Sequence, residues 1–209
     1  MGSGSGGATK STGRSSWAVR KARTRQALID VALELFAAQR YESTSIEQIA
    51  DRAGVSPRTF FRYFVTKESV LFFGEDDYVR SLVEVYVAQP AALNEMEAMR
   101  ASFVTLAPRI IRIRERVNSY EKAVAASAVL RGRAQDSYDA NVAAVAGAIA
   151  RRRGLAQPDE SCELLAAVGN LCLRRATAHW LRDHTCDLEK RITAEFTNLT
   201  RLVCSSDGP

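Results

Sequence analysis

The chain has 209 residues, of which 46% are hydrophobic and 25% are charged, a balance typical of a soluble globular protein with space for a small and a larger domain. No apolar run approaches the roughly 20 residues that cross a bilayer, and the N-terminus lacks the apolar segment of a secretory signal, so we expect a cytoplasmic protein. The net charge of +5 lies in residues 1–65, which hold 10 basic and 5 acidic residues and therefore favour nucleic acid as a partner.

Glycine and serine dominate residues 1–16, as expected for a flexible basic tail. The positive charges of the tail and of the next segment suit either an arm in the neighbouring DNA minor groove or a solvated surface. They are Lys10, Arg14, Arg20, Lys21, Arg23 and Arg25. The first helix is predicted to begin between Ser16 and Thr24 and to end near Gln39. Its apolar stripe consists of Ile29, Ala32, Leu33 and Phe36.

Two short helices separated by a glycine turn are predicted next. Thr44 and Ser45 each precede a glutamate or glutamine by three residues, the spacing of a capping box. Gly54 allows the chain to reverse after the first helix. Ser56 suits the N-cap of the second helix, and Pro57 suits its first position. A helix, a turn of three to four residues and a second helix is the spacing of a helix-turn-helix.

The second short helix carries an unusual outward face. Phe60 and Phe64 are four residues apart and are predicted to face the core. The remaining side chains can bind guanine, meet a thymine methyl group or donate to phosphate. They are Arg58, Thr59, Phe61, Arg62 and Tyr63, with Lys67 just beyond. The alternative is an ordinary helical hairpin whose aromatic residues lie in a core.

This stretch resembles the TetR/AcrR family of bacterial transcriptional regulators over Arg25–Leu71. The resemblance rests on the segments LELFAAQRY, IEQIADRAGVS, TFFRYF and TKESVL. The family often has glycine near Arg58 and tyrosine at Phe61, so base contacts are expected to differ in detail.

The resemblance implies a role for each part of the helix pair. The helix from Pro57 to Phe64 would read bases, while Tyr63 and Lys67 would grip phosphates. Thr44 or Ser45 would present a helix N-terminus to phosphate, because free N–H groups there favour an anion.

Beyond Lys67 the pattern is helical throughout, so the predicted fold class is all-α. Helices are expected at about 68–88, 91–106, 109–129, 137–153, 162–182 and 188–203, with Pro108 kinking or dividing the chain. The expected domains are the tail (1–16), a three-helix helix-turn-helix domain (17–66), and a ligand-binding and dimerisation domain (67–205).

The last two helices suit a subunit interface. One is dense in small residues, and the other has a continuous apolar seam that includes Leu188, Ile192, Phe196, Leu199 and Val203. Two such helices from each of two subunits would make a four-helix bundle, the arrangement that the family resemblance implies. A twofold homodimer would present two recognition helices to a palindromic operator.

The middle helices are the expected place for a small lipophilic or amphipathic effector. The candidate ligand residues offer apolar walls with a few polar groups. They are Phe103, Arg109, Tyr120, Val124, Asn170 and Trp180. Arg109, with Arg112 and Arg116 on the same helix face, could receive an anionic group. Ordinary core packing, and for the arginines a solvated face, are the alternatives.

No cofactor or metal site is expected. His179, His184 and Cys186 lie close in sequence, but their spacing matches no usual ligand pattern. The sequence also lacks a nucleophile elbow and a phosphate-binding glycine loop, so we expect no enzyme. The prediction is a ligand-responsive DNA-binding regulator of the repressor type. A regulator without a small-molecule ligand, and a helical enzyme, are the competing hypotheses.

Overall fold

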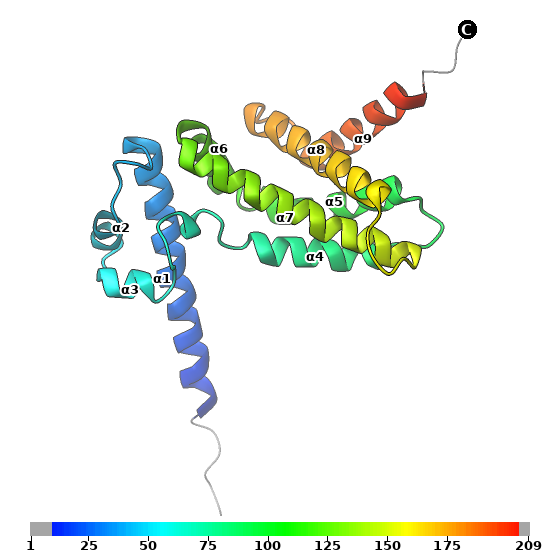
Figure 1. The fold of residues 1–209 in the computed structure, drawn as a ribbon. Coiled ribbons are helices and arrows are strands. Elements are labelled where there is room, and N and C mark those ends of the chain that lie inside the picture. Colours follow the sequence, from blue (N-terminus) through cyan, green and yellow to red (C-terminus); the bar gives the residue numbers. More distant parts are fainter. Residues whose placement is uncertain (1–9, 205–209) are drawn as a thin grey trace, which may run out of the picture. The chain divides into compact units, whose positions relative to one another are not determined.

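The computed structural model describes the backbone of residues 10–204 and the side chains of residues 16–203. Every regular element in that part is a helix (Figure 1), which confirms the all-α fold class. The elements are α1 (Lys10–Gln39), α2 (Ile46–Arg52), α3 (Pro57–Phe61), the short 3-10 helix η1 (Glu68–Val70), α4 (Glu75–Val87), α5 (Glu95–Ile111), α6 (Arg114–Ala126), α7 (Ala128–Arg153), α8 (Glu160–Arg182) and α9 (Leu188–Cys204). No helix within these residues has the length and apolar character to span a membrane.

The chain divides into two compact units. The N-terminal unit runs to Phe73 and also includes Lys122–Leu130, where α6 ends and α7 begins. The C-terminal unit holds Gly74–Glu121 and the chain from Arg131 onward. The division therefore falls later than the expected border after residue 66, and the α6–α7 corner belongs to the first unit rather than the second.

Two polar contacts explain why the α6–α7 corner belongs to the N-terminal unit. The Arg40 guanidinium donates to the carbonyl oxygen of Ala126 at 2.9 Å, and the Ser127 hydroxyl donates to the Glu42 carboxylate at 2.5 Å. Arg40 has φ +71°, a left-handed conformation that costs a non-glycine residue about 1 kcal/mol. The bond to Ala126 helps to hold Arg40 in this conformation.

The predicted apolar stripe of α1 forms the core of the N-terminal unit. Ile29, Ala32, Leu33 and Phe36 are all buried, as are Ile49, Ala50 and Phe60 of the two short helices, and α2 contacts both α1 and α3. Helical packing of this kind supplies most of the stability of α2 and α3, because isolated helices so short are not stable in water.

Several helix boundaries differ from those expected. α1 begins at Lys10, so residues 10–16 are helical rather than a flexible tail; extending an existing helix costs far less than starting one. Instead of one helix over 68–88 there are η1 and α4, separated by Gly74 with φ +91°. Pro108 lies within the last turn of α5, where it removes only one intrahelical N–H. α7 begins at Ala128 rather than near residue 137.

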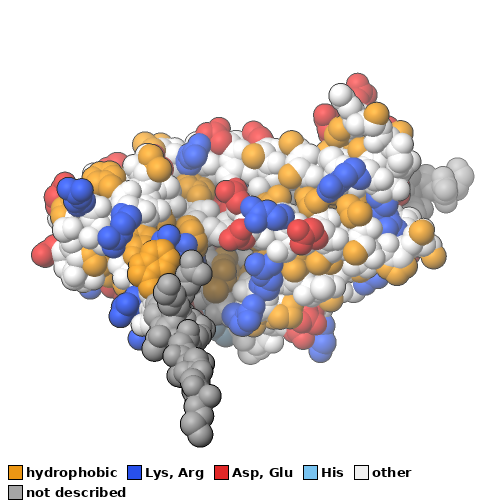
Figure 2. Space-filling view, turned by 90° about the horizontal axis from the view of Figure 1, so that it is seen from below, with side chains coloured by type: hydrophobic (Ala, Val, Ile, Leu, Met, Phe, Trp, Pro, Cys, Tyr) orange, Lys and Arg blue, Asp and Glu red, His pale blue; other side chains and the backbone are white. Residues whose placement is uncertain are grey.

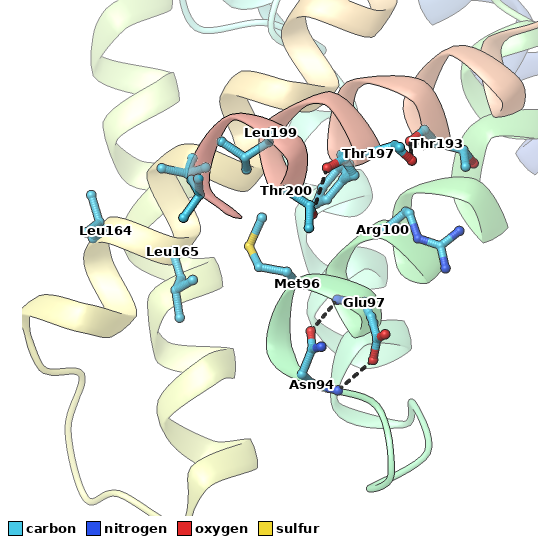
Figure 3. Close-up of a pocket in the computed structure, with 13 residues that line it drawn as sticks. Asn94, Met96, Glu97, Arg100, Leu164, Leu165, Thr193, Thr197, Leu199 and Thr200 are labelled. Atoms are coloured by element: carbon cyan, nitrogen blue, oxygen red, sulfur yellow. Dashed lines mark hydrogen bonds between the residues drawn. The ribbon is translucent and has the colours of Figure 1, made fainter. Parts of the chain in front are cut away.

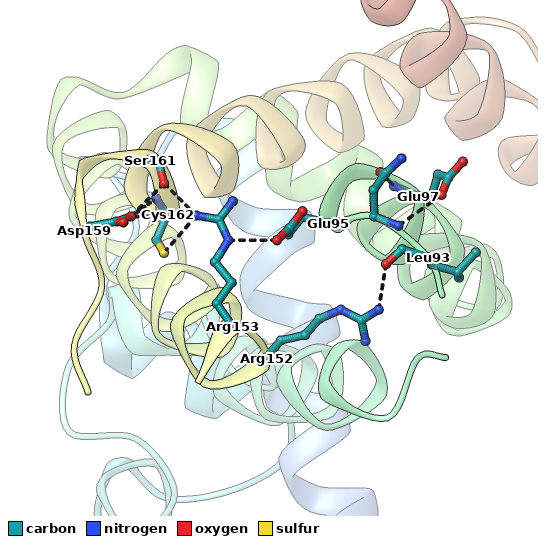
Figure 4. Close-up of polar contacts among 9 residues, drawn as sticks. Leu93, Glu95, Glu97, Arg152, Arg153, Asp159, Ser161 and Cys162 are labelled. Atoms are coloured by element: carbon teal, nitrogen blue, oxygen red, sulfur yellow. Dashed lines mark hydrogen bonds and ion pairs between the residues drawn. The ribbon is translucent and has the colours of Figure 1, made fainter. Parts of the chain in front are cut away.

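The end of α7 ties together three parts of the C-terminal unit (Figure 4). Arg152 donates to carbonyl oxygens of the α4–α5 connection, including that of Leu93 at 2.9 Å. Arg153 pairs with Glu95 at 2.8 Å and donates to the Ser161 hydroxyl at 2.6 Å. The start of α5 and the start of α8 are therefore both fixed to α7.

A buried carboxylate joins α8 to α9. Glu195 is 5% exposed and accepts hydrogen bonds from Arg175 of α8, at 3.0 Å, and from Arg191 of its own helix, at 2.5 Å. Burial alone would raise the pKa of Glu195, but the hydrogen bonds from the two arginines lower it overall. The carboxylate therefore stays ionised at neutral pH and holds the two helices in register.

Candidate nucleic-acid interface

The first short helix begins with a capping box at Ser45. Its hydroxyl accepts from the N–H of Gln48 at 3.2 Å, and the Gln48 side chain accepts from the N–H of Ser45 at 2.9 Å. Of the two candidate N-caps, the structure thus selects Ser45. Thr44 is only 2% exposed, and its hydroxyl donates to the carbonyl oxygen of Arg40 at 2.8 Å. Thr44 is therefore part of the α1–α2 connection.

The turn between α2 and α3 is built on Gly54. Its φ of +69° is the left-handed conformation that its position predicts. The N–H of Gly54 donates to Asp51 and that of Val55 to Ala50, both at 2.9 Å. These bonds occupy carbonyl groups left free at the end of α2, so the turn has a defined direction.

α3 separates a buried aromatic face from an exposed one. Ser56 is its N-cap and accepts from the N–H of Thr59 at 3.2 Å. Phe60 is fully buried and Phe64 is 3% exposed, whereas Phe61 is 55% exposed. α3 ends at Phe61, earlier than the predicted Phe64.

The predicted base and phosphate readers lie on or just after α3. Arg58, Phe61 and Arg62 are exposed, and Thr59 and Tyr63 are half-buried. The Arg62 guanidinium lies 5.3 Å from the centre of the Tyr63 ring. The face of the molecule drawn in Figure 2 carries basic, acidic and hydrophobic side chains side by side. Guanidinium, aromatic and hydroxyl groups on one short helix can contact both base edges and phosphates.

Sequence reasoning missed Val65, which is 84% exposed just after α3. An apolar side chain in that position can meet a thymine methyl group. The sequence feature that could have identified Val65 is its place between Phe64, which is predicted to be buried, and the polar segment that starts at Thr66.

Lys67 has an internal role that the sequence did not indicate. Its ammonium donates to the carbonyl oxygens of Tyr41 at 2.7 Å and Thr44 at 2.6 Å, and lies 4.0 Å from the centre of the Tyr41 ring. Burial lowers the pKa of Lys67, while the nearby carboxylates of Glu68 and Glu42 oppose that shift. The lysine thus fixes the connection that leads into α2, and its contact with phosphate stays a prediction.

Replacing Lys67 by methionine is expected to lower both stability and DNA affinity. Two hydrogen bonds to carbonyl groups are lost, so the free energy of unfolding should fall by about 1–2 kcal/mol. DNA affinity should fall by a similar factor for every sequence, because a phosphate contact carries no sequence information. Urea unfolding and binding titrations with several duplexes measure the two effects. Lys190→Met on α9 removes the same charge and is the control; a loss confined to one base pair would contradict the assignment.

The six candidate ligand residues are spread over both units. Val124 lies in the N-terminal unit and the other five in the C-terminal unit. Phe103 is fully buried, with its ring 6.1 Å from that of Phe196. Trp180 is 3% exposed and packs under the Arg114 guanidinium, 4.3 Å from its ring centre. These two large side chains are part of the core.

The polar candidates have partners within the protein. Arg109 donates to the Ser81 hydroxyl at 2.6 Å, and Asn170 donates to the carbonyl oxygen of Ala166 at 2.9 Å. Burial raises the pKa of Tyr120 well above its usual value. A ligand role for these residues stays a prediction.

The C-terminal unit has a groove of about 840 Å³ between α5, α8 and α9 (Figure 3). Its walls are mainly apolar, and the polar side chains of Asn94 and Glu97 at one edge form the capping box of α5. The groove is lined by Asn94, Met96, Glu97, Arg100, Leu164, Leu165, Val168, Thr193, Phe196, Thr197, Leu199, Thr200 and Val203. The described lining therefore includes none of the six candidate ligand residues.

The described residues hold no group of three histidine, cysteine or acidic side chains arranged to bind a metal ion. His179 lies in the last turn of α8, and His184 and Cys186 lie in the connection to α9. Within this part of the chain, Cys162 and Cys172 are buried free thiols and Cys186 is a half-buried one.

Comparison with known proteins identifies two matching segments. Residues 28–72 match the model of the bacterial regulatory proteins of the tetR family, and residues 93–203 match that of the MftR C-terminal domain. The first match covers α2, α3 and the buried half of α1, and the second covers most of the C-terminal unit.

Individual relatives are also regulators. The chain is 42% identical over 88 residues to the transcriptional regulator TcmR of Streptomyces glaucescens, a match that spans 42% of this chain and only 39% of TcmR. It is 26% identical over 181 residues to the transcriptional regulator MftR of Mycobacterium tuberculosis, covering 85% of this chain and 89% of that protein. Thermus thermophilus FadR, a transcriptional repressor solved with lauroyl-CoA, has a similar fold. Its TM-score is 0.54 at 23% identity, covering 88% of this chain and 96% of FadR.

Proposed function

Because this chain belongs to the tetR family of bacterial regulatory proteins, we propose that it is a ligand-responsive transcriptional repressor that acts in the cytoplasm. It binds a palindromic operator as a homodimer and is released by a small-molecule effector. One observation carries the proposal. A capped helix-turn-helix exposes Arg58, Phe61 and Arg62 while it buries Phe60 and Phe64.

The exposed side chains of α3 suit base reading. Arg58 and Arg62 are exposed, and arginine can bind guanine through two parallel hydrogen bonds. Phe61 and Val65 add apolar contacts that favour thymine. The N-terminus of α2, beside Ser45, is the positive end of the helix dipole, which suits a phosphate.

The homodimer proposal is supported by an exposed apolar face on α8 and α9. Leu164 and Leu171 are seven residues apart on α8 and are 65% and 41% exposed. Leu202 and Val203 near the end of α9 are 76% and 67% exposed. Soluble monomers rarely expose apolar side chains in such a group, whereas a four-helix interface would cover them.

The effector proposal rests on the character of the C-terminal unit. Its groove has apolar walls edged by polar groups, which suits a lipophilic or amphipathic molecule, and it shares Leu164 and Val203 with the apolar face assigned to the dimer. A similar fold accommodates lauroyl-CoA in FadR. The candidate residues Phe103, Arg109, Tyr120, Val124, Asn170 and Trp180 do not line this groove, and they remain proposed contacts for a ligand that enters between the middle helices instead.

Two connections of the chain join the C-terminal unit to the N-terminal unit, and either can transmit the effect of ligand binding to the helix-turn-helix. One is the connection from Phe73 to Gly74, which leads into α4. The other is the pair α6 and α7, whose adjoining ends belong to the N-terminal unit through Arg40 and Glu42. The effector releases DNA only if it binds the DNA-incompetent state more tightly, since differential affinity alone shifts the equilibrium.

Replacing Arg58 by alanine is expected to weaken operator binding by about 1–3 kcal/mol and to relax the preference at one base pair. The reason is the loss of a side chain that reads a base edge. Binding titrations with single-base-pair variants of the operator measure both effects. Arg80→Ala, which removes an exposed positive charge from α4, is the matched control. An equal loss of affinity for every duplex would show that Arg58 contacts only the backbone.

A further inference from the structure

α1 continues well before the segment that matches the family model. The model begins at residue 28, whereas α1 begins at Lys10. We define the α1 extension as residues 16–24, which form the earliest part of α1 with described side chains. Residues 16–23 are all exposed. The extension contains Arg20, Lys21 and Arg23, and no acidic residue occurs before Asp30.

One face of α1 runs from the core of the N-terminal unit into the extension. Trp17, Lys21, Arg25, Leu28 and Ala32 follow a spacing of three and four residues and so share a helix face. Leu28 and Ala32 are fully buried in the N-terminal unit. Farther toward the N-terminus the same face carries positive charge and an indole ring that is 60% exposed.

Aromatic contacts relate this face to α3. The Arg25 guanidinium lies 4.4 Å from the centre of the Phe73 ring, and the Phe73 ring lies 6.0 Å from that of Phe64. Phe64 packs in turn against Phe60, under α3, at 5.5 Å. Arg25 is therefore linked through Phe73 and Phe64 to Phe60, the buried residue of α3. The α1 extension continues from Arg25 toward the N-terminus (Figure 1).

From this arrangement we infer that the α1 extension binds the DNA backbone beside the operator, with Lys21 and Trp17 facing the duplex. The inference rests on the proposed DNA binding by α3. At about 1.5 Å per residue the extension is about 13 Å long, the length of about four base pairs at 3.4 Å each. A rigid helix of that length can reach phosphates that α3 does not contact.

Charge and chemistry favour DNA as the partner. Three basic side chains on about two and a half turns, with no acidic neighbour, complement phosphates. The Lys21 ammonium lies 5.2 Å from the centre of the Trp17 ring, which keeps the two groups together on the exposed face. An indole can pack against a sugar or in a groove while the ammonium reaches the adjacent phosphate.

The test compares two operator duplexes, one that ends at the palindrome and one with about six extra base pairs on each side. The full chain should bind the longer duplex about tenfold more tightly. A variant with Arg20→Ala, Lys21→Ala and Arg23→Ala should lose that advantage. Its plot of log affinity against log salt should be shallower by about 0.9 for each lost phosphate contact. The control replaces Arg80, Arg133 and Arg151 by alanine and removes the same charge elsewhere.

Trp17 gives an independent readout, because the other tryptophan, Trp180, is 3% exposed. The longer duplex should protect Trp17 from quenching by acrylamide, and the shorter one should not. Trp17→Phe should abolish that change in signal.

Three other outcomes have distinct meanings. Equal affinity for both duplexes and an unchanged salt slope, with the operator still bound, would overturn this inference alone. Failure of the full chain to bind any operator would overturn the proposed function as well. A blue shift of Trp17 on phosphatidylserine vesicles, without dependence on duplex length, would assign the extension to a lipid surface and also overturn the inference.

Discussion

Replacing both Leu164 and Leu202 by glutamate is expected to give a monomer that binds the operator at least about 100-fold more weakly. The two side chains are 65% and 76% exposed on α8 and α9. In the proposed four-helix interface they would be covered, and burying an unpaired carboxylate there is costly. The operator effect is large because linking two reading modules increases affinity by about 10² to 10⁴.

For the double variant, analytical ultracentrifugation measures the oligomeric state and titration with the operator measures the affinity for DNA. Leu155→Glu is the matched control, because that leucine is 40% exposed and lies in the connection between α7 and α8 rather than on α8 or α9. The control should remain dimeric and bind the operator normally. A double variant that stays dimeric would place the interface elsewhere, and a monomer with unchanged affinity would remove the need for a dimer.

The second large effect is expected from Phe60→Ala, which should destabilise the N-terminal unit by about 3–5 kcal/mol. Phe60 is fully buried and contacts the rings of Phe61 and Phe64 at 5.7 and 5.5 Å. Truncation leaves a cavity under α3 that this small unit cannot readily fill. Operator binding should be lost, because α3 no longer has a fixed position.

Phe61→Ala is the matched comparison for Phe60→Ala, since the adjacent ring is 55% exposed. It should change stability by no more than about 0.5 kcal/mol and weaken DNA binding through the lost base contact. Hydrogen exchange followed by mass spectrometry separates the two cases. Phe60→Ala should speed exchange in α2 and α3 and leave α8 unchanged. Similar exchange in both variants would contradict the division into a buried and a reading face.

The features that sequence predicted best are those that depend on neighbouring residues. The Ser45 cap, the left-handed Gly54 and the Ser56 cap each follow from contacts made within five residues. The buried stripe of α1 follows from helical periodicity, which is also local.

Contacts between distant residues explain most of what the sequence did not reveal. The bonds of Lys67 join it to carbonyl groups more than 20 residues earlier, and those of Arg40 and Glu42 reach the α6–α7 corner. No periodicity encodes such pairs. For the same reason sequence alone could not show that Phe103 and Trp180 are buried in the core of the C-terminal unit.

Helix boundaries were also difficult to predict from sequence where one glycine can either continue a helix or end it. Gly74 is compatible with a helix, yet it adopts φ +91° and separates η1 from α4. Gly132 is equally permissive, but it lies inside α7. The difference depends on the packing of the flanking segments, which local propensity does not describe.

The proposed function requires that this chain reads a specific operator as a dimer. The most direct test is selection of bound sequences from random duplex DNA by the full chain at near-physiological salt, where attraction by charge alone is reduced. A dimeric reader should enrich a palindrome whose half-sites are about one helical turn apart. Recovery of DNA without any shared sequence would contradict it.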